Sequence, residues 1–182
     1  MKIVRSLALT VLMISLLTGC AASREAAEEK REAILARGFS CEARLTCDLG
    51  NTATVYTMEA ALGEQTHLRV IEPEALCGLG ATVERKTLSL CYQDAVFACE
   101  LPEDSVYSPV MVLPAAWAAL CDGVVVKSEK TEEGLLAVFS RFEGEEEYLF
   151  AFLFGGEDTP IKRISLEKNG RELASVVILR TL

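Results

Sequence analysis

Short stretches in which apolar and polar residues alternate occur along most of this 182-residue chain, and they constrain its fold more than any other feature. Residues 39–47, FSCEARLTC, are the clearest example, because every second residue is apolar. A period of two is typical of a β-strand that buries one face. Gly50-Asn51 and Asn169-Gly170 are signals for tight turns between such strands. The sequence therefore predicts a mainly β (α+β) domain built from consecutive hairpins.

The expected strands follow one another with short turns between them, which predicts an antiparallel meander. About ten strands in one sheet must curl strongly or close, so we expect a strongly curved antiparallel half-barrel. One strand, Glu146–Phe154, is apolar on both faces and should be central and covered on both sides. Besides this strand and residues 39–47, the expected strands are Thr52–Leu62, Thr66–Ile71, Ala81–Arg85, Thr87–Tyr92, Ala95–Leu101, Leu135–Phe142, Ile161–Glu167 and Arg171–Arg180.

A dense apolar segment, Val110 to Cys121, interrupts the β pattern in the middle of the chain. Within it, Ala115 to Cys121 is expected to form a short helix that is apolar on nearly all sides, and such a helix is buried. A curled sheet needs side chains to fill its concavity, and this segment can supply them. We therefore expect a short apolar helical lid on the half-barrel.

The first residues have the features of a bacterial export signal. Lys2 and Arg5 form a basic region, and residues 6–17 are apolar but shorter than the roughly 20 residues that a membrane-spanning helix needs. Leu17-Thr18-Gly19-Cys20 resembles the lipobox of bacterial lipoproteins. The resemblance implies cleavage before Cys20 and attachment of acyl chains such as palmitate to that cysteine. Two or more acyl chains would hold the protein firmly on a bilayer.

These features divide the chain into three expected parts. Residues 1–19 are a lipoprotein signal peptide, residues 20–38 are the lipidated N-terminus with a tether helix, and residues 39–182 are the β domain. The tether helix carries mainly Ala as apolar residues before Ile34 and Leu35, so we expect it to be solvated, with only its last turn docked. The expected location is a cell membrane, facing outside the cytoplasm, or the outer membrane if the source has two membranes.

Charge and cysteine content narrow the function classes. A net charge of −9 argues against nucleic acid or an anionic lipid surface as the main partner, since both require basic patches. His67 is the only histidine and no C-x-x-C pair occurs, so zinc-ligand spacing is absent and no cofactor is expected. Most of the cysteines after Cys20 lie among apolar residues, where a free thiol packs as a small hydrophobe. Disulfides are the alternative for these six, Cys41, Cys47, Cys77, Cys91, Cys99 and Cys121.

Several soft motifs follow one another in a characteristic order. They are Glu72-Pro73-Glu74-Ala75-Leu76-Cys77-Gly78 after the third strand, the apolar helix in mid-chain, and Thr159-Pro160-Ile161-Lys162 before the hairpin at Asn169-Gly170. Their order over most of residues 39–180 resembles the LolA/LolB-like lipoprotein-carrier superfamily. The resemblance implies an open half-barrel whose apolar cavity holds acyl chains. Lipid-anchored relatives include a clostridial spore-germination lipoprotein that partners a cell-wall amidase.

The sequence departs from the soluble carriers of that superfamily in one place. Those carriers have an Arg-Pro pair before the third strand, whereas this chain has Leu62-Gly63-Glu64-Gln65. The departure argues against a strict role in lipoprotein shuttling.

Catalysis finds little support in the sequence. A Ser-His-Asp or Cys-His site would have to use His67, which lies in an expected strand beside Leu68 and Arg69 and is predicted to be a surface or packing residue. The acidic residues around Glu143 flank a turn and lack the spacing of calcium ligands. No nucleophile elbow or phosphate-binding loop occurs either. We therefore expect a protein that is not an enzyme.

Two functions follow as hypotheses. The first is binding of a lipid or an acylated protein in an apolar cavity. The second is a scaffold or activator lipoprotein that docks an envelope enzyme, such as a peptidoglycan amidase, through a sheet edge or the acidic loops. The candidate lining residues of the cavity are large apolar side chains, which can equally fill the core: Met58, Met111, Trp117, Phe139, Phe150 and Phe152.

Overall fold

The computed structural model describes residues 22–48, 53–85, 87–101 and 108–182, and these form one sheet with two helices against it. Alternation of apolar and polar residues, together with tight turns, produces the strands as the sequence predicts. Their bounds are β1 Phe39–Cys47, β2 Thr54–Leu62, β3 Gln65–Glu72, β4 Gly80–Glu84, β5 Thr87–Tyr92, β6 Ala95–Glu100, β7 Val124–Lys130, β8 Leu135–Glu143, β9 Glu146–Phe154, β10 Ile161–Lys168 and β11 Arg171–Thr181.

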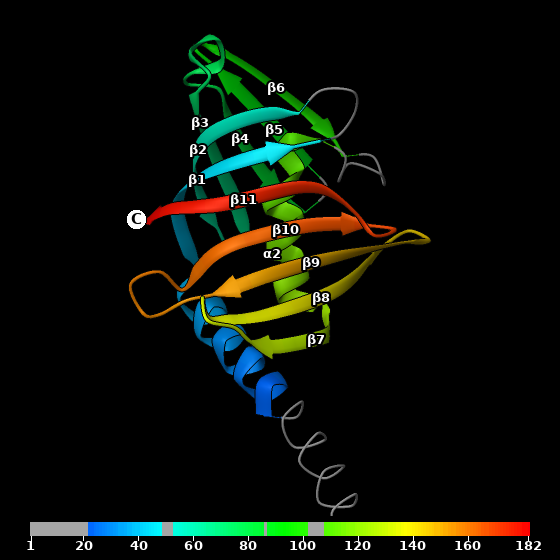
Figure 1. The fold of residues 1–182 in the computed structure, drawn as a ribbon. Coiled ribbons are helices and arrows are strands. Elements are labelled where there is room, and N and C mark those ends of the chain that lie inside the picture. The colour runs from blue at the N-terminus through cyan, green and yellow to red at the C-terminus, as the bar shows by residue number, and fades with distance from the viewer. Residues whose placement is uncertain (1–21, 49–52, 86, 102–107) are drawn as a thin grey trace, which may run out of the picture.

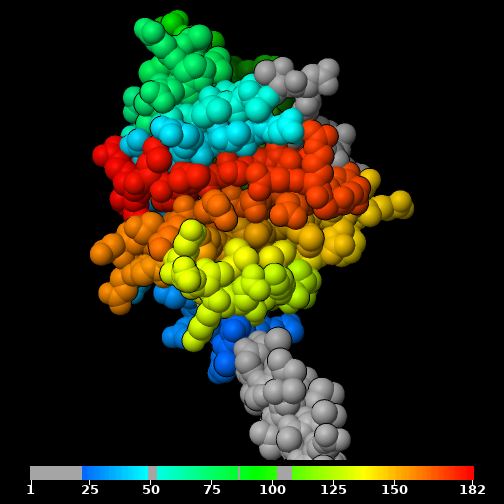
Figure 2. Space-filling model, in the orientation of Figure 1, coloured from blue at the N-terminus to red at the C-terminus, as the bar shows by residue number. Residues whose placement is uncertain are grey.

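All neighbouring strands are antiparallel, in the order β6-β5-β4-β3-β2-β1-β11-β10-β9-β8-β7. The sheet therefore consists of two meanders, β1 to β6 and β7 to β11, which meet where β1 pairs with β11 (Figure 1). Within the described residues the sheet stays open, with β6 at one end and β7 at the other. On the outer face the strands lie side by side as successive bands (Figure 2).

Two helices cover the inner, core-facing side of the sheet. Helix α2, Val112–Asp122, follows the 3-10 turn η3, Pro109–Met111, and packs against β2, β8 and β10 across the concavity (Figure 1). It is buried along nearly its whole length, as an apolar helix inside a curved sheet must be. The second helix, residues 22–37, lies at the β7 end and is called the N-terminal helix below (Figure 1).

A single hydrophobic core joins the sheet to both helices. In β1 every second side chain is buried, and in β9 the four aromatic side chains Tyr148, Phe150, Phe152 and Phe154 are all buried on the core-facing side. Phe139 of β8 meets Phe152 edge to face, with ring centroids 5.4 Å apart. This is a favourable arrangement for aromatic pairs, and it fixes the packing beneath α2.

The predicted fold class, a curved antiparallel half-barrel with an apolar helix, is confirmed, with four corrections. The sheet has eleven strands, because Val124–Lys130 forms the edge strand β7, whose largely exposed side chains give no clean period. Helix α2 begins at Val112 rather than Ala115, since Pro114 lies in its first turn, where its missing N–H is not needed. The outer face of β9 is only half-covered at Leu149 and Ala151, although Leu153 on that face is buried, because both described helices lie on the core-facing side of the sheet.

The fourth correction concerns the N-terminal helix, which docks along much of its length and not only by its last turn. Ala27 and Ile34 are both buried in the core. Alanine lets the helix approach the sheet closely, so a helix poor in large apolar residues still has a buried face.

Candidate functional site

The core-facing residues of β5 and β6 form an apolar surface that the helices leave uncovered. These residues, called the apolar strip below, are Leu90, Tyr92, Ala95, Phe97 and Cys99. Phe97 is 62% exposed and Tyr92 is 41% exposed. Leu90 and Cys99 are half-buried and pack against the main core. The strip is therefore an exposed extension of the core rather than a separate surface.

The strand register shows how the strip is connected to the core. One row of directly opposed residues crosses six neighbouring strands and is apolar throughout, from buried positions near the centre to Phe97 at the end. In order from β1 to β6, the row is Cys41, Ala60, Leu68, Ala81, Leu90 and Phe97. Opposed residues share one face of a sheet, so Phe97 lies on the same side as α2.

The chemistry of the strip suits an apolar ligand. It contains no charged side chain, and its only strong hydrogen-bonding side chain is the phenol of Tyr92. Ligand sites for lipids are mainly apolar with a few polar groups that orient the ligand. Covering exposed apolar surface is worth roughly 25 cal/mol per Å². An acyl chain laid over Phe97 and Leu90 would gain this free energy, whereas a charged ligand would lose hydration.

The six residues predicted to line a cavity lie elsewhere, in the packed part of the core. All six are buried among the sheet, η3 and α2. Neither of the two surface pockets described next includes any of them. The structure brings them together as one cluster, and their role in ligand binding stays a prediction: Met58, Met111, Trp117, Phe139, Phe150 and Phe152.

Two surface pockets lie away from the strip. A shallow groove of about 450 Å³ lies over β1, β2 and β3 and includes His67, whose Nδ1 is 3.1 Å from Thr82 Oγ1. The exposed His67 is thus a surface residue, as the sequence predicts. A second pocket of about 430 Å³ lies between the N-terminal helix and the β7–β8 region, with Lys30 and Lys130 at its border.

Backbone carbonyls hold the N-terminal helix on the domain through two basic side chains. Arg31 donates to Cys121 O and Gly123 O at the C-terminal end of α2, and its guanidinium lies 5.8 Å from the centre of the Phe139 ring. Lys30 Nζ donates to Gly155 O at 3.1 Å. A cation suits the carbonyl end of a helix because of the helix dipole. The N-terminal helix is therefore fixed to α2.

The six described cysteines are all free thiols. The prediction of packing cysteines is right for Cys41 and Cys47, where burial raises the pKa of the thiols to about 12 and about 11. The prediction is wrong for Cys77, Cys91 and Cys121, which are exposed. The exposed positions lie at the hook of η1 (Glu74–Leu76), on the outer face of β5 and at the end of α2.

Within the described ranges, no group of three or more His, Cys, Asp or Glu residues is placed to hold a metal ion. No helix in the described part of the chain has the length and apolar character needed to span a bilayer. Cys20, the predicted lipidation site, lies outside the described residues.

Sequence reasoning placed Ala95–Leu101 in a strand but missed the apolar strip itself. A strand in the middle of a sheet and a strand at its edge can have the same alternating pattern. The alternation alone therefore does not predict that Phe97 is exposed. The available hint is that residues 95–99 are all apolar on both faces, without a charge.

Comparisons with known proteins relate this chain to others through its fold. No family model and no curated protein sequence matches it. The chain is similar to an uncharacterized conserved protein from Thermus thermophilus, with a TM-score of 0.50 and 11% identity over 88% of this chain and 86% of that one. It is also similar to a LolA superfamily protein from Nitrosomonas europaea, with a TM-score of 0.47 and 9% identity over 87% and 92% of the two chains.

A third similar structure is the lipoprotein LppX from Mycobacterium tuberculosis, with a TM-score of 0.40 and 9% identity over 86% of this chain and 93% of that one. A LolA superfamily protein is thus among the structures that the chain is similar to. At these identities the similarity describes the fold.

Proposed function

We propose that this chain is a lipid-anchored protein of the bacterial cell envelope that binds an acyl chain of a lipid or of an acylated protein on the apolar strip, without catalysis. The observation that carries the proposal is the position of Phe97. The row that leads to it is apolar and core-facing, buried from Cys41 to Ala81 and half-buried at Leu90, yet Phe97 itself is 62% exposed. A large apolar side chain on the inner side of a sheet is normally covered.

The shape of the strip favours a linear apolar ligand over a compact one. The strip follows two paired strands and extends from Ala95 to Cys99 on β6, which corresponds to roughly 13 Å along the strand. Each methylene group buried against it would contribute about 0.8 kcal/mol. Half-buried Val110 of η3 and Leu101 also pack against the core and add apolar surface.

The expected anchor leaves the strip accessible. The N-terminal helix lies at the β7 end of the sheet, and β5 and β6 lie at the other end (Figure 1). Cys20 precedes the described helix by two residues, so acylation there would place the membrane near the start of that helix. An acyl ligand could then reach the strip without competing with the helix for space.

Native mass spectrometry and binding of a fluorescent fatty acid test the proposal directly. Residues 21–182 contain the whole sheet, both helices and the core, and are suited to purification without detergent. We expect a bound lipid-sized mass and saturable binding of the fatty acid. Phe97→Glu should weaken binding at least tenfold, because it places a carboxylate on the strip.

Val96→Glu is the matched control, because Val96 is 75% exposed on the opposite face of the same strand. It should leave fatty-acid binding unchanged. A protein that stays free of lipid and binds no fatty acid, or that loses binding equally in both variants, would contradict the proposal.

The second hypothesis from the sequence, docking of an envelope enzyme such as a peptidoglycan amidase, stays a prediction. The free edge of β6 favours a protein partner of some kind. That edge consists of backbone groups, so it is independent of the side chains that form the apolar strip.

A further inference from the structure

Between Ala95 and Cys99, within the described part of the chain, the outer edge of β6 lacks the features that normally keep a sheet edge from pairing with other chains. Among the described strands only β5 pairs with β6. Five consecutive residues, 95–99, are apolar, and Val96 and Phe97 are exposed on opposite faces. Natural edge strands are usually protected by a charge, a proline or a bulge. The described register of β6 is regular, and its first charged residue is Glu100.

The register identifies the backbone groups that face outward. Tyr92 and Ala95 flank a two-residue turn and are directly opposed, so they form the hydrogen-bonded pair that closes the hairpin. Hydrogen-bonded and non-hydrogen-bonded pairs alternate along an antiparallel ladder. The backbone N–H and C=O groups of Val96, Ala98 and Glu100 therefore point away from β5. They are available to a further strand.

Charge argues against a second copy of this chain as that strand. Aligning the apolar residues 95–99 of two copies in an antiparallel pair centres the pair on Phe97. Asp94, the turn residue directly before β6, is then brought next to Glu100 of the other copy at both ends of the pair, and facing like charges are destabilising. Parallel pairing in register would place each of these carboxylates opposite itself. Both arrangements are therefore disfavoured.

The position of the edge argues in the same direction. The edge of β6 lies at the end of the sheet farthest from β7 and the N-terminal helix (Figure 1). Edge-to-edge pairing of two copies would place their N-terminal helices at the two far ends of the combined sheet. Copies anchored side by side through Cys20 in one membrane would not adopt this arrangement readily, whereas a partner without such an anchor can approach freely.

We propose that the outer edge of β6 pairs with an extended segment of a different protein, which is apolar or uncharged over five residues and carries Lys or Arg on each side. The two basic residues, six positions apart, would lie opposite Asp94 and Glu100. Main-chain hydrogen bonds supply the affinity in such strand addition, and the flanking charges supply the specificity. This inference is independent of acyl binding.

A pair of synthetic peptides tests the inference on the full-length gene product, processed by a bacterial host and held in lipid nanodiscs. The probe is the capped peptide Lys-Thr-Val-Thr-Val-Thr-Lys, and its control carries Glu in place of both Lys residues. We expect the Lys peptide to bind at least tenfold more tightly, and to slow hydrogen exchange of the segment that contains Val96, Ala98 and Glu100. With the charges reversed in Asp94→Lys/Glu100→Lys, the protein should bind the Glu peptide more tightly than the Lys peptide.

Ala98→Pro gives a second, independent test, because it removes an outward N–H while leaving the β5 ladder intact. It should weaken binding of the Lys peptide at least tenfold without reducing fatty-acid binding by the strip. Equal binding of both peptides, or binding that Ala98→Pro does not affect, would overturn the inference. Stable dimers of the protein that form through β6 without peptide would overturn it in favour of a second copy.

Discussion

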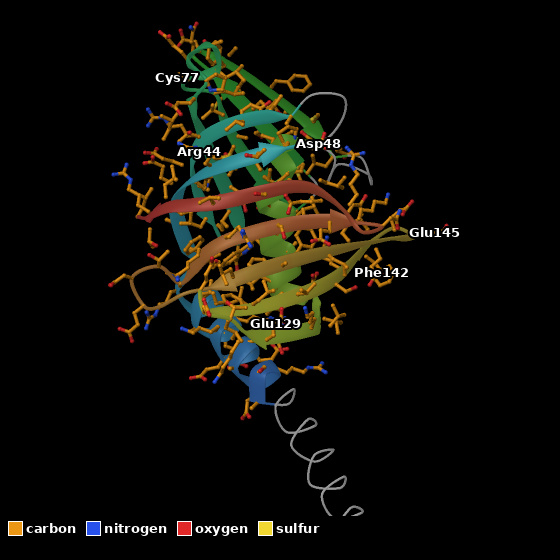
Figure 3. All side chains as sticks on the ribbon, in the orientation of Figure 1. Arg44, Asp48, Cys77, Glu129, Phe142 and Glu145 are labelled. Atoms are coloured by element: carbon orange, nitrogen blue, oxygen red, sulfur yellow. The ribbon has the colours of Figure 1, made fainter. Side chains whose placement is uncertain are left out.

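The two ends of the sheet are built in opposite ways. At the β7 end, the register of β7 against β8 is irregular between Val125 and Lys127. Lys127 Nζ also forms an ion pair with Glu129 Oε1 at 3.0 Å. The N-terminal helix also lies against this end. At the β6 end the edge is regular, apolar from Ala95 to Cys99, and not covered by either described helix. Glu129 lies on β7, and Cys77 lies at the hook between β3 and β4, in the half of the sheet that contains β6 (Figure 3).

This difference teaches that one chain can protect one sheet edge while leaving the other exposed. Bulges and lysines are the usual means by which an edge avoids aggregation. They are present on β7 and absent from the described β6 edge, so of the two edges the β6 edge is the one open to pairing. The exposed apolar end is thus the part of the molecule where a ligand or partner is expected.

The largest expected effect separates the two ends by their aromatic side chains. Phe139→Ala should lower the free energy of unfolding by about 3–5 kcal/mol, because Phe139 is fully buried beneath α2 and packs on Phe152. Phe97→Ala should change it by less than about 1 kcal/mol, although Phe97 also faces inward. Urea unfolding monitored by circular dichroism measures both values.

Phe142→Ala is a control on the same strand as Phe139, since Phe142 is 63% exposed and projects from the region of the β8–β9 hairpin (Figure 3). Its effect should resemble that of Phe97→Ala. If Phe97→Ala lowers the free energy of unfolding as much as Phe139→Ala does, the β6 end is covered. The contrast between the two ends of the sheet would then be wrong.

A smaller effect is expected from the contacts that hold the N-terminal helix at the β7 end. Arg31→Ala removes hydrogen bonds from a charged donor to Cys121 O and Gly123 O, which should cost about 1.5–3 kcal/mol. Hydrogen exchange should increase in residues 22–37 and at the end of α2, and stay unchanged in β5 and β6. Arg24→Ala, an exposed site on the same helix, should have little effect. Unchanged exchange in Arg31→Ala would show that Ala27 and Ile34 alone dock the helix.

The most gradual effect concerns pH and the thiols buried in β1, because it develops over several pH units. Burial raises the pKa of Cys41 from its ordinary value of 9.0 to about 12, so the folded state keeps its proton where the unfolded state loses it. Stability should therefore be unaffected by this group below pH 9 and fall between pH 9 and 12, by at most about 1.4 kcal/mol per pH unit. Urea unfolding from pH 8 to 10.5 measures the slope.

Cys41→Ala should make the alkaline slope shallower, while Cys91→Ala, at an exposed thiol on β5, should leave it unchanged. Equal slopes in both variants would mean that water reaches Cys41 in the folded state. That result would mean that the core-facing side is accessible to water at the centre of the sheet as well as at the β6 end.

Sequence patterns predicted most of the strands because burial of one face imposes a period of two. They failed at β7 and at the apolar strip for one reason: a local pattern does not show which strand ends the sheet. They also missed how the N-terminal helix docks, since Arg31 and Lys30 bind backbone carbonyls and contribute nothing to hydrophobic periodicity. The six predicted cavity residues are buried beneath η3 and α2, which are distant from most of them in sequence, and their role in ligand binding stays a prediction.

The pairing of β1 with β11 has a consequence for how the chain assembles. The first and the last strand of the domain are neighbours, so the two meanders can join only after the whole chain has been delivered. Contacts of such sequence separation form slowly. Until β11 arrives, β1 is a second unpaired edge, and the first meander is open on both sides. A chain that stops before β11 would therefore expose two unpaired edges and be prone to aggregation.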